Sequence, residues 1–362
     1  MDAVDADEQA LQDEIIDMSK MMKLINEKQL IRNAKKIGLN DSSFETVLVV
    51  KVHNNIKHLG VLLDSIRKIR YITKSLLIFA HDYYNFDINF MLRRVPYVRT
   101  MQIFYPYSSQ IYPDIYPGRD DRFCRRMNRC VLSNRRNATL AQSKLFWWWV
   151  TSQVFDHIDA LKEYEGYIYF LESELYLSCD FIHVMKMMEK LQPLFCPQCR
   201  LLSLASRPPR PEQYSSNNNS LVVDAWGPNF SSSVTGFHRQ TWHEIKYRKQ
   251  AFCYLNDSSW GNSLRYLFST THEQKLLVLS TEGPRAFSTK GCGEFRNRTG
   301  CSMDRVVLDI SNFLSKIQRE LFPEYFELKV GDTGTNETMQ GYGNWEDARD
   351  KEFCMYIAIR NS

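Results

Sequence analysis

Hydrophobic runs and amphipathic stretches alternate along the first third of the chain. Buried strands are predicted at 46–50, 75–80 and 101–105, with helices at 59–69 and 89–94 between them. Strands that alternate with helices are typical of an α/β fold with a parallel, Rossmann-like sheet. Ligands bind such sheets beyond the carboxyl ends of the strands, so the polar residues that follow each strand are the first candidates for function.

The segment before the first strand has the apolar spacing of a helix. Apolar residues recur there every three or four positions, at Leu11, Ile15, Met18, Met22 and Ile25. This spacing predicts a helix over residues 8–37 that ends at Gly38. We interpret residues 1–40 as an N-terminal helix or the remnant of a stem.

A second group of elements follows an irregular stretch at 106–140. A helix is predicted over 142–162, and it carries Trp147–Trp149, of which at least two should lie in the core. A strand over 166–171 runs into Glu172-Ser173-Glu174, and a helix is predicted over 181–191. Residues 208–220 read as a loop, and the order of elements after residue 221 is less regular.

Charge and glycine patterns exclude several function classes. The net charge is only +4 and no long basic run occurs, so nucleic acid is not an implied partner. No glycine-rich phosphate loop follows the first strand, which argues against a dinucleotide cofactor or a P-loop.

Nine cysteines carry information about the compartment. Cys196 and Cys199 form a CxxC motif, which invites a zinc or redox interpretation. A zinc site needs two further ligands, and no second CxxC or HxxxH supplies them. Local disulfides in an oxidising compartment fit the spacing better.

Glycosylation sequons point to the same compartment. Asn-X-Ser/Thr occurs at Asn40, Asn137, Asn218, Asn229, Asn256, Asn297 and Asn336. Together with the cysteines, these favour a luminal or extracellular chain. Residues 1–14 are acidic and lack the apolar core of a signal peptide. The alternatives are a cytosolic protein or an anchor encoded upstream, and the cysteines and sequons favour the second.

Paired carboxylates follow the strand at 166–171. Glu172 and Glu174 alternate with Ser173, so both should point the same way from the strand. Carboxylates at such a position suit Mg²⁺ or Mn²⁺, which would neutralise a departing nucleoside diphosphate. Taken alone, the triplet is a weak signal, because a solvated Glu-Ser-Glu turn is the more common explanation of such a triplet.

Several stretches, in one order from about residue 30 to 358, resemble the N-acetylglucosaminyltransferase II family. They are Val49–Asn54, Leu62–Lys68, Ile78–Asp82, Gln110–Pro113, Tyr116–Gly118, Gln142–Lys144, Trp147–Trp149, Phe170–Leu177 and Gly343–Asp350. The resemblance implies a GT-A fold, with a mostly parallel central sheet and helices on both faces. It divides residues 41–358 into a nucleotide-sugar half, 41–180, and an acceptor half, 181–358.

The resemblance also implies an activity and a location. A family member is a Golgi type II membrane protein with a luminal catalytic domain. It transfers N-acetylglucosamine from UDP-GlcNAc to a mannose of the α-1,6 arm of an N-glycan, in β-1,2 linkage with inversion, and uses Mn²⁺. Homo-oligomers or association with other Golgi transferases are further possible partners.

Matching the family's motifs implies a set of site residues in this chain. The nucleotide or substrate positions are Lys51, Val52, His53, Asn54, Asn55, Asp82, Arg126, Gln142, Ser143, Lys144, Leu145, Phe146 and Arg210. Glu174 falls on the metal aspartate of the family. The implied disulfides are Cys124–Cys130, Cys196–Cys199, Cys253–Cys354 and Cys292–Cys301, with Cys179 left odd.

The chain departs from the family at the positions that carry the chemistry. Leu175 stands where the family has histidine, and Ser288 stands at a histidine metal ligand. Gly261 stands at the catalytic aspartate, and glycine cannot take a proton. Asp257, four residues earlier, is a weak substitute. The acceptor-side stretch is replaced by Ser231–Val234.

Three hypotheses follow from these departures. The chain is an N-acetylglucosaminyltransferase II with impaired activity, an inactive homologue that binds nucleotide, glycan or a partner enzyme, or a GT-A transferase with another donor or acceptor.

Overall fold

The computed structural model describes residues 3–34, 44–119, 136–205, 208–215, 219–227, 233–269, 275–290, 302–331 and 343–360. Its centre is a nine-stranded sheet in the order β11-β7-β9-β6-β8-β4-β1-β2-β3. The strands are β1 (Thr46–Val52), β2 (Ser75–His81), β3 (Arg99–Phe104), β4 (Ile168–Glu172), β6 (Leu201–Ser203), β7 (Ser220–Ala225), β8 (Val234–Phe237), β9 (Leu277–Thr281) and β11 (Glu327–Val330). The pairs β1–β2, β1–β4, β2–β3, β6–β9 and β7–β11 are parallel.

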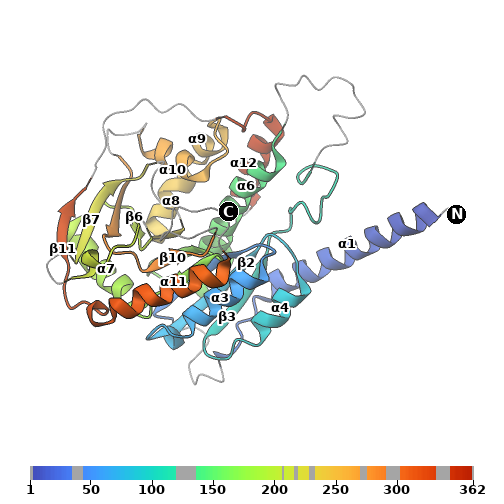
Figure 1. The fold of residues 1–362 in the computed structure, drawn as a ribbon. Coiled ribbons are helices and arrows are strands. Elements are labelled where there is room, and N and C mark those ends of the chain that lie inside the picture. Colours follow the sequence, from blue (N-terminus) through green and yellow to red (C-terminus); the bar gives the residue numbers. More distant parts are fainter. Residues whose placement is uncertain are drawn as a thin grey trace.

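Helices cover both faces of this sheet, and the alternation of side chains along β1 decides which core each residue joins. Val47 and Val49 pack in one core, while Leu48, Val50 and Val52 pack in the other. The first core is closed by α6 (Ala138–Ser152), α8 (Arg239–Tyr247), α9 (Lys249–Tyr254), α10 (Trp260–Ser269) and α12 (Ala348–Arg360). The second is closed by α3 (Ile56–Ile66), α4 (Phe86–Arg93) and α7 (Phe181–Phe195). This arrangement, visible in Figure 1, confirms the predicted α/β class with a mostly parallel sheet.

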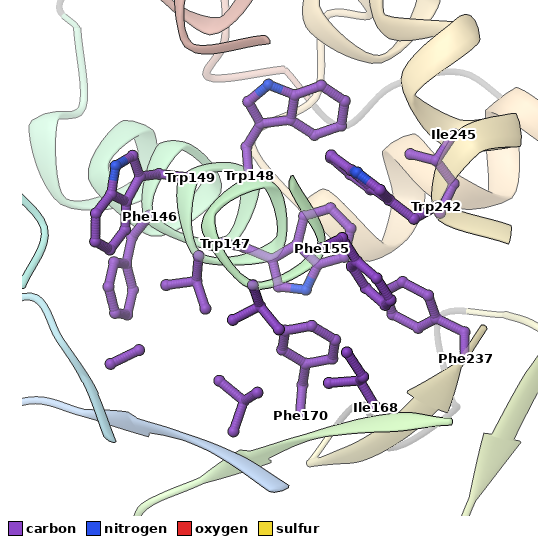
Figure 2. Close-up of a cluster of buried hydrophobic side chains, with 14 of the residues drawn as sticks. Phe146, Trp147, Trp148, Trp149, Phe155, Ile168, Phe170, Phe237, Trp242 and Ile245 are labelled. Carbon is purple, nitrogen blue, oxygen red and sulfur yellow. The ribbon is translucent and has the colours of Figure 1, made fainter. Parts of the chain in front are cut away.

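All three consecutive tryptophans lie in the first core, so the expectation for this helix is confirmed. Trp147, Trp148 and Trp149 are 2%, 0% and 3% exposed. Figure 2 shows Trp242 of α8 against this cluster, and its ring centroid lies 5.2 Å from that of Trp148. Buried rings of this size contribute much of the apolar area that holds α6 to the sheet. The predicted helix 142–162 is shorter than expected, because a π-helical turn, Gln153–His157, and a 3₁₀ turn, Asp159–Leu161, follow α6.

A two-stranded antiparallel sheet lies beside the main one. It pairs β5 (Leu175–Leu177) with β10 (Ala286–Ser288), and Ser288 stands opposite Leu175. Phe287 packs with Tyr176, Tyr214 and α11 (Met303–Lys316) in a separate small core. Tyr214 belongs to a 3₁₀ turn, Pro211–Tyr214, inside the predicted loop 208–220. Short 3₁₀ turns also stand at Ile72–Lys74 and Gln318–Glu320.

The N-terminal helix differs from its prediction. The helix α1 spans Ala3–Lys28, because Gln29 takes a positive φ of 43° and its N–H closes the last turn onto Ile25 O. The chain then extends, and Arg32 bridges to Thr100 beside β3. Gly38 lies outside the described residues. The buried Met22 packs with Phe104, so the base of α1 is part of the folded body.

Candidate functional site

The carboxyl ends of β1, β2 and β4 meet at one edge of the sheet, where the sequence places its donor-side residues. Lys51 of β1 stands in register with Glu172, the last residue of β4. Lys51 Nζ lies 2.6 Å from Glu172 Oε1, and the lysine side chain is only 13% exposed. Because a charge that is mostly out of water needs a partner, Glu172 holds Lys51 at this edge.

A second charged pair stands one strand further along. His53 Nδ1 lies 2.7 Å from Asp82 Oδ1, and the two side chains are 70% and 32% exposed. The hydrogen bond to Asp82 raises the pKa of His53, although partial burial opposes the shift. Asp82 N donates to Val52 O, so the two strand ends are joined by their main chain as well. The pair presents an imidazole and a carboxylate at the ends of two neighbouring strands, β1 and β2.

The loop from β1 into α3 is ordered by two asparagines. Asn55 caps α3, because its side-chain oxygen accepts from His58 N. Asn54 Oδ1 accepts from Asn85 Nδ2 at 2.6 Å. The predicted donor residues Lys51, His53, Asn54, Asn55 and Asp82 are therefore brought together. The prediction that the Val52 side chain contacts the nucleotide is corrected, because this side chain is 1% exposed and packs in the core. Only the main chain of Val52 lies at this edge of the sheet.

Glu174 and Ser288 also come together, but not as the paired-carboxylate pattern suggested. The strand ends at Glu172 and the chain bends at 173–174 before β5, so Glu172 and Glu174 do not share one strand face. Thr289 N donates to Glu174 O beside the Ser288–Leu175 pair of the small sheet. The Glu174 carboxylate forms an ion pair with the Lys290 ammonium. Nothing in the sequence pattern had drawn attention to Lys290.

The residues at this position do not fit a resident divalent cation. Glu174 is a single carboxylate, Ser288 offers only a hydroxyl and Leu175 offers nothing. In the described part of the chain no group of three His, Cys, Asp or Glu side chains could hold a metal ion. A cation of the protein itself, Lys290, already neutralises Glu174.

Gly261, the predicted position of the catalytic base, follows Trp260, whose ring lies near the Lys51–Glu172 pair. Gly261 is the second residue of α10, and its carbonyl accepts from Trp226 Nε1 at 2.9 Å. The neighbouring Trp260 stacks on Trp147, with ring centroids 4.6 Å apart, and Lys51 Nζ lies 5.6 Å from the Trp260 ring centroid. The tertiary structure thus carries this position to the donor edge, although glycine offers no proton acceptor there.

Asp257 is held for a structural purpose and is not presented as a base. It is 1% exposed. Its Oδ1 accepts from Ser259 N and its Oδ2 accepts from Asn262 Nδ2, so the carboxylate fixes the turn into α10. The buried Lys144 donates to the Asp257 main-chain carbonyl at 2.7 Å.

The start of α6 corrects part of the predicted substrate-contacting stretch. Leu145 and Phe146 are 0% and 7% exposed in the aromatic core, so we assign them to packing. Lys144 is fully buried over the rings of Trp345 and Phe252. Gln142 donates to Tyr107 O and Pro117 O and so ties α6 to the preceding loop, whereas Ser143 is exposed.

The remaining predicted residues are dispersed. Arg210 stands before the 3₁₀ turn Pro211–Tyr214, and its exposed side chain lies 3.9 Å from Glu212. Arg126, Cys124–Cys130 and Cys292–Cys301 lie outside the described residues. Cys196–Cys199 and Cys253–Cys354 are disulfides in the structure, and Cys179 is free.

The family model for N-acetylglucosaminyltransferase II matches residues 19–354, which is nearly the whole chain. This chain belongs to the N-acetylglucosaminyltransferase II family. The match confirms the family resemblance carried by the sequence motifs and, with the sheet described above, the GT-A glycosyltransferase class.

Curated relatives of this family come from animals and plants, and each is named alpha-1,6-mannosyl-glycoprotein 2-beta-N-acetylglucosaminyltransferase. The rat protein is 32% identical over 348 residues, which cover 91% of this chain and 78% of the relative. The human protein is 31% identical, with 91% and 77% covered. The Arabidopsis thaliana protein is 27% identical over 329 residues, with 86% and 74% covered.

Solved structures resemble the chain more distantly. Residues 1–349 of S. aureus TarS align with a TM-score of 0.38 at 10% identity, over 76% of this chain and 73% of that one. A mannosyltransferase from Pyrobaculum calidifontis in complex with GDP-Man and Mn²⁺ aligns with a TM-score of 0.34 at 8% identity, over 86% and 83%.

Proposed function

We propose that this chain binds UDP-GlcNAc at the carboxyl edge of β1, β2 and β4. It transfers N-acetylglucosamine to the α-1,6-arm mannose of N-glycans, in β-1,2 linkage with inversion and at a reduced rate. Membership of the N-acetylglucosaminyltransferase II family over residues 19–354 is the observation that carries this proposal. The ordered donor edge around Lys51, His53 and Asp82 supports it.

The reduced rate follows from the acceptor side of the site. An inverting transfer needs a group that takes the proton of the acceptor hydroxyl, and such a base contributes roughly 10²- to 10⁴-fold. Gly261 has no side chain for this purpose, and Asp257 is buried and engaged with Ser259 and Asn262. Donor binding is therefore better preserved than proton removal.

Mn²⁺ is implied by the family, and Glu174 is the carboxylate that would face it. A metal brought in by the diphosphate would have to separate Glu174 from Lys290.

The second candidate function is an inactive homologue that binds nucleotide or glycan, or partners an active transferase. The glycine at the base position favours it, because that loss removes proton transfer and leaves the donor edge in place. A different donor or acceptor is the third candidate, and the changes at Ser231–Val234 motivate it.

The compartment and the partners belong to this proposal as well. The Golgi lumen fits the disulfides, and a family member would be held there by a type II anchor. In the part of the chain that the structure describes, no helix is both long and apolar enough to span a membrane. A homo-oligomer, or a complex with other Golgi transferases, is proposed as the working assembly.

Two measurements test the proposed function in sequence. Isothermal titration calorimetry with UDP and UDP-GlcNAc asks whether the donor binds. A radiolabelled-donor assay with a biantennary N-glycan acceptor, compared with GDP- and UDP-sugar alternatives, then asks what is transferred. Binding without detectable transfer would favour the inactive homologue, and transfer from another sugar nucleotide would favour the third candidate.

A further inference from the structure

The position where the family would hold a metal carries a cation of this chain itself, Lys290. Lys290 follows β10 directly, and its ammonium forms an ion pair with Glu174, the residue at the family's metal position. Its main-chain N–H donates to Ser288 Oγ at 3.2 Å, which ties it to the other degenerate ligand position. The two residues that replace metal ligands thus contact the same lysine.

The residue before Lys290 is anchored by two hydrogen bonds. Thr289 N donates to Glu174 O at 3.0 Å, and Thr289 Oγ1 lies 2.6 Å from His58 Nδ1 in the first turn of α3. Burial, and then the nearby charge of Lys290, lower the pKa of His58. The lysine charge therefore stands near both Glu174 and His58 in the first turn of α3, and Figure 1 shows α3 close to β10.

An ammonium can perform the electrostatic part of what a divalent cation does for a diphosphate. It is a compact positive charge with three donors on a flexible stem. Hydrogen bonds between an ammonium and phosphate oxygens are short and charge-assisted. The Lys290 side chain is 63% exposed, so it can reach toward a ligand while Glu174, at 24%, stays in the wall of the site.

We propose that Lys290 forms the diphosphate-binding cation of this chain, so that it binds a nucleoside diphosphate without a divalent metal. Glu174 neutralises the ammonium until the diphosphate arrives and competes with the diphosphate for it, and Glu174 no longer serves as a metal ligand. This inference rests on the proposed function, since it concerns the donor of that same site.

The test is titration calorimetry of the full chain with UDP, in EDTA and again with Mn²⁺. The unmodified chain is expected to bind UDP in EDTA, with little change on adding Mn²⁺. Lys290→Ala should weaken binding by roughly 10- to 100-fold, as expected for a lost charge-assisted contact. Lys290→Arg, which keeps the charge, should stay within about tenfold of the unmodified chain.

Two further variants separate this role from ordinary surface charge. Lys329 lies on the distant edge strand β11 and forms a comparable ion pair with Glu282, so Lys329→Ala should leave UDP binding unchanged. Glu174→Gln releases Lys290 and should tighten UDP binding in EDTA by up to about fivefold. A metal ligand at Glu174 predicts the opposite sign, a loss of Mn²⁺-dependent binding.

The outcomes distinguish the inference from the proposed function. Binding that requires Mn²⁺ and is indifferent to Lys290→Ala overturns the inference and leaves the UDP-sugar donor standing. A chain that binds no UDP in either buffer overturns the proposed donor, and the inference with it.

Discussion

At the scale of the residue, Gly261 is the position with the largest chemical consequence. It stands in the first turn of α10 beside Trp226, at the donor edge. A Cβ built there would meet the Trp226 ring at 3.5 and 3.6 Å, which is ordinary van der Waals contact. A carboxylate in the first turn of a helix is also favourable. The scaffold therefore accepts an aspartate at this position, where the sequence resemblance predicts the catalytic aspartate.

We expect N-acetylglucosamine transfer by the unmodified chain to lie roughly a thousandfold or more below that of a relative with the base intact. Gly261→Asp should recover about a hundredfold or more of that loss, because it supplies a proton acceptor at the donor edge. Adding Ser288→His and Glu174→Asp should make the gain depend on Mn²⁺.

The matched control for this prediction is Gly261→Asn, which has nearly the same shape and no basic carboxylate. An equal gain with asparagine would show that packing, and not proton transfer, limits the rate. Turnover by the unmodified chain at family rates would show that another residue acts as the base, and Asp257→Asn would then be the variant to assay.

Lys144 gives a second prediction at this scale, on the pH dependence of stability. Burial lowers its pKa from 10.5 to about 7. Between these two values the unfolded chain binds more protons at this position than the folded chain, so the free energy of unfolding increases as the pH rises. The cost of burying the charged Lys144 side chain lowers the free energy of unfolding by its full amount below pH 7, and this cost disappears as the pH approaches 10.5.

Replacing Lys144 with methionine should remove this contribution. The difference in unfolding free energy between the unmodified chain and Lys144→Met should change by up to about 1.4 kcal/mol per pH unit between pH 7 and 9. Urea unfolding at each pH measures it, and Lys329→Met, at a partly exposed lysine, serves as the control. Parallel stability curves for the unmodified chain and Lys144→Met would contradict the prediction.

At the scale of the element, the Cys253–Cys354 disulfide joins two helices that are far apart in sequence. It links α9 to α12 across a separation of 101 residues, and both cysteines are fully buried. Trp345 lies just before α12, and its Nε1 donates to Cys253 O. Its ring centroid lies 4.3 Å from Lys144 Nζ. The C-terminal helix is thereby fixed against α6 and α9, where it closes the aromatic core.

The two described disulfides should differ in what they contribute to stability. In the chain-entropy account, a loop of this size contributes about 4.7 kcal/mol, whereas the short Cys196–Cys199 loop contributes roughly 2 kcal/mol. Cys253→Ala with Cys354→Ala should therefore lower the guanidinium midpoint more than Cys196→Ala with Cys199→Ala. Equal midpoints for the two double variants would argue against the entropic account in this fold.

At the scale of the whole molecule, one sheet runs through both predicted halves. The strand β4 of the first half pairs with β1 on one side and with β8 of the second half on the other. The strand β8 in turn pairs with β6, so no sheet edge separates residues 41–180 from 181–358. The Arg136–Asp350 ion pair, 7% and 2% exposed, joins distant parts of the chain in the same way.

We therefore expect the two halves to unfold together. Tryptophan fluorescence reports the aromatic core and far-UV circular dichroism reports the whole chain, and both should give one coincident transition in guanidinium. Two separated midpoints would indicate that the halves are independently stable. Residues 41–180 expressed alone should aggregate, because β4 would present an unpaired edge.

The sequence alone determined the parts of this protein that depend on local pattern and on motif order. Runs of β-branched and aliphatic residues, separated by amphipathic helices, specify strands near β1, β2 and β3 and a parallel α/β sheet. The ordered motifs identify the family, and the tryptophans of α6 indicate its core face. A local pattern does not predict an element boundary that contacts with distant residues determine. The helix α1, for example, ends at Lys28 and not at Gly38 as the pattern predicted.

The tertiary structure alone decided which residues meet at the site. Lys290 lies more than a hundred residues from Glu174 in sequence, and only the pairing of β5 with β10 brings their charges together. The same holds for the neighbour of Gly261, Trp260, whose ring stacks on Trp147 and lies 5.6 Å from Lys51 Nζ. Side-chain burial likewise assigned Val52, Leu145 and Asp257 to structural roles. Such contacts depend on the three-dimensional position of each strand end, which periodicity and spacing along one chain do not encode.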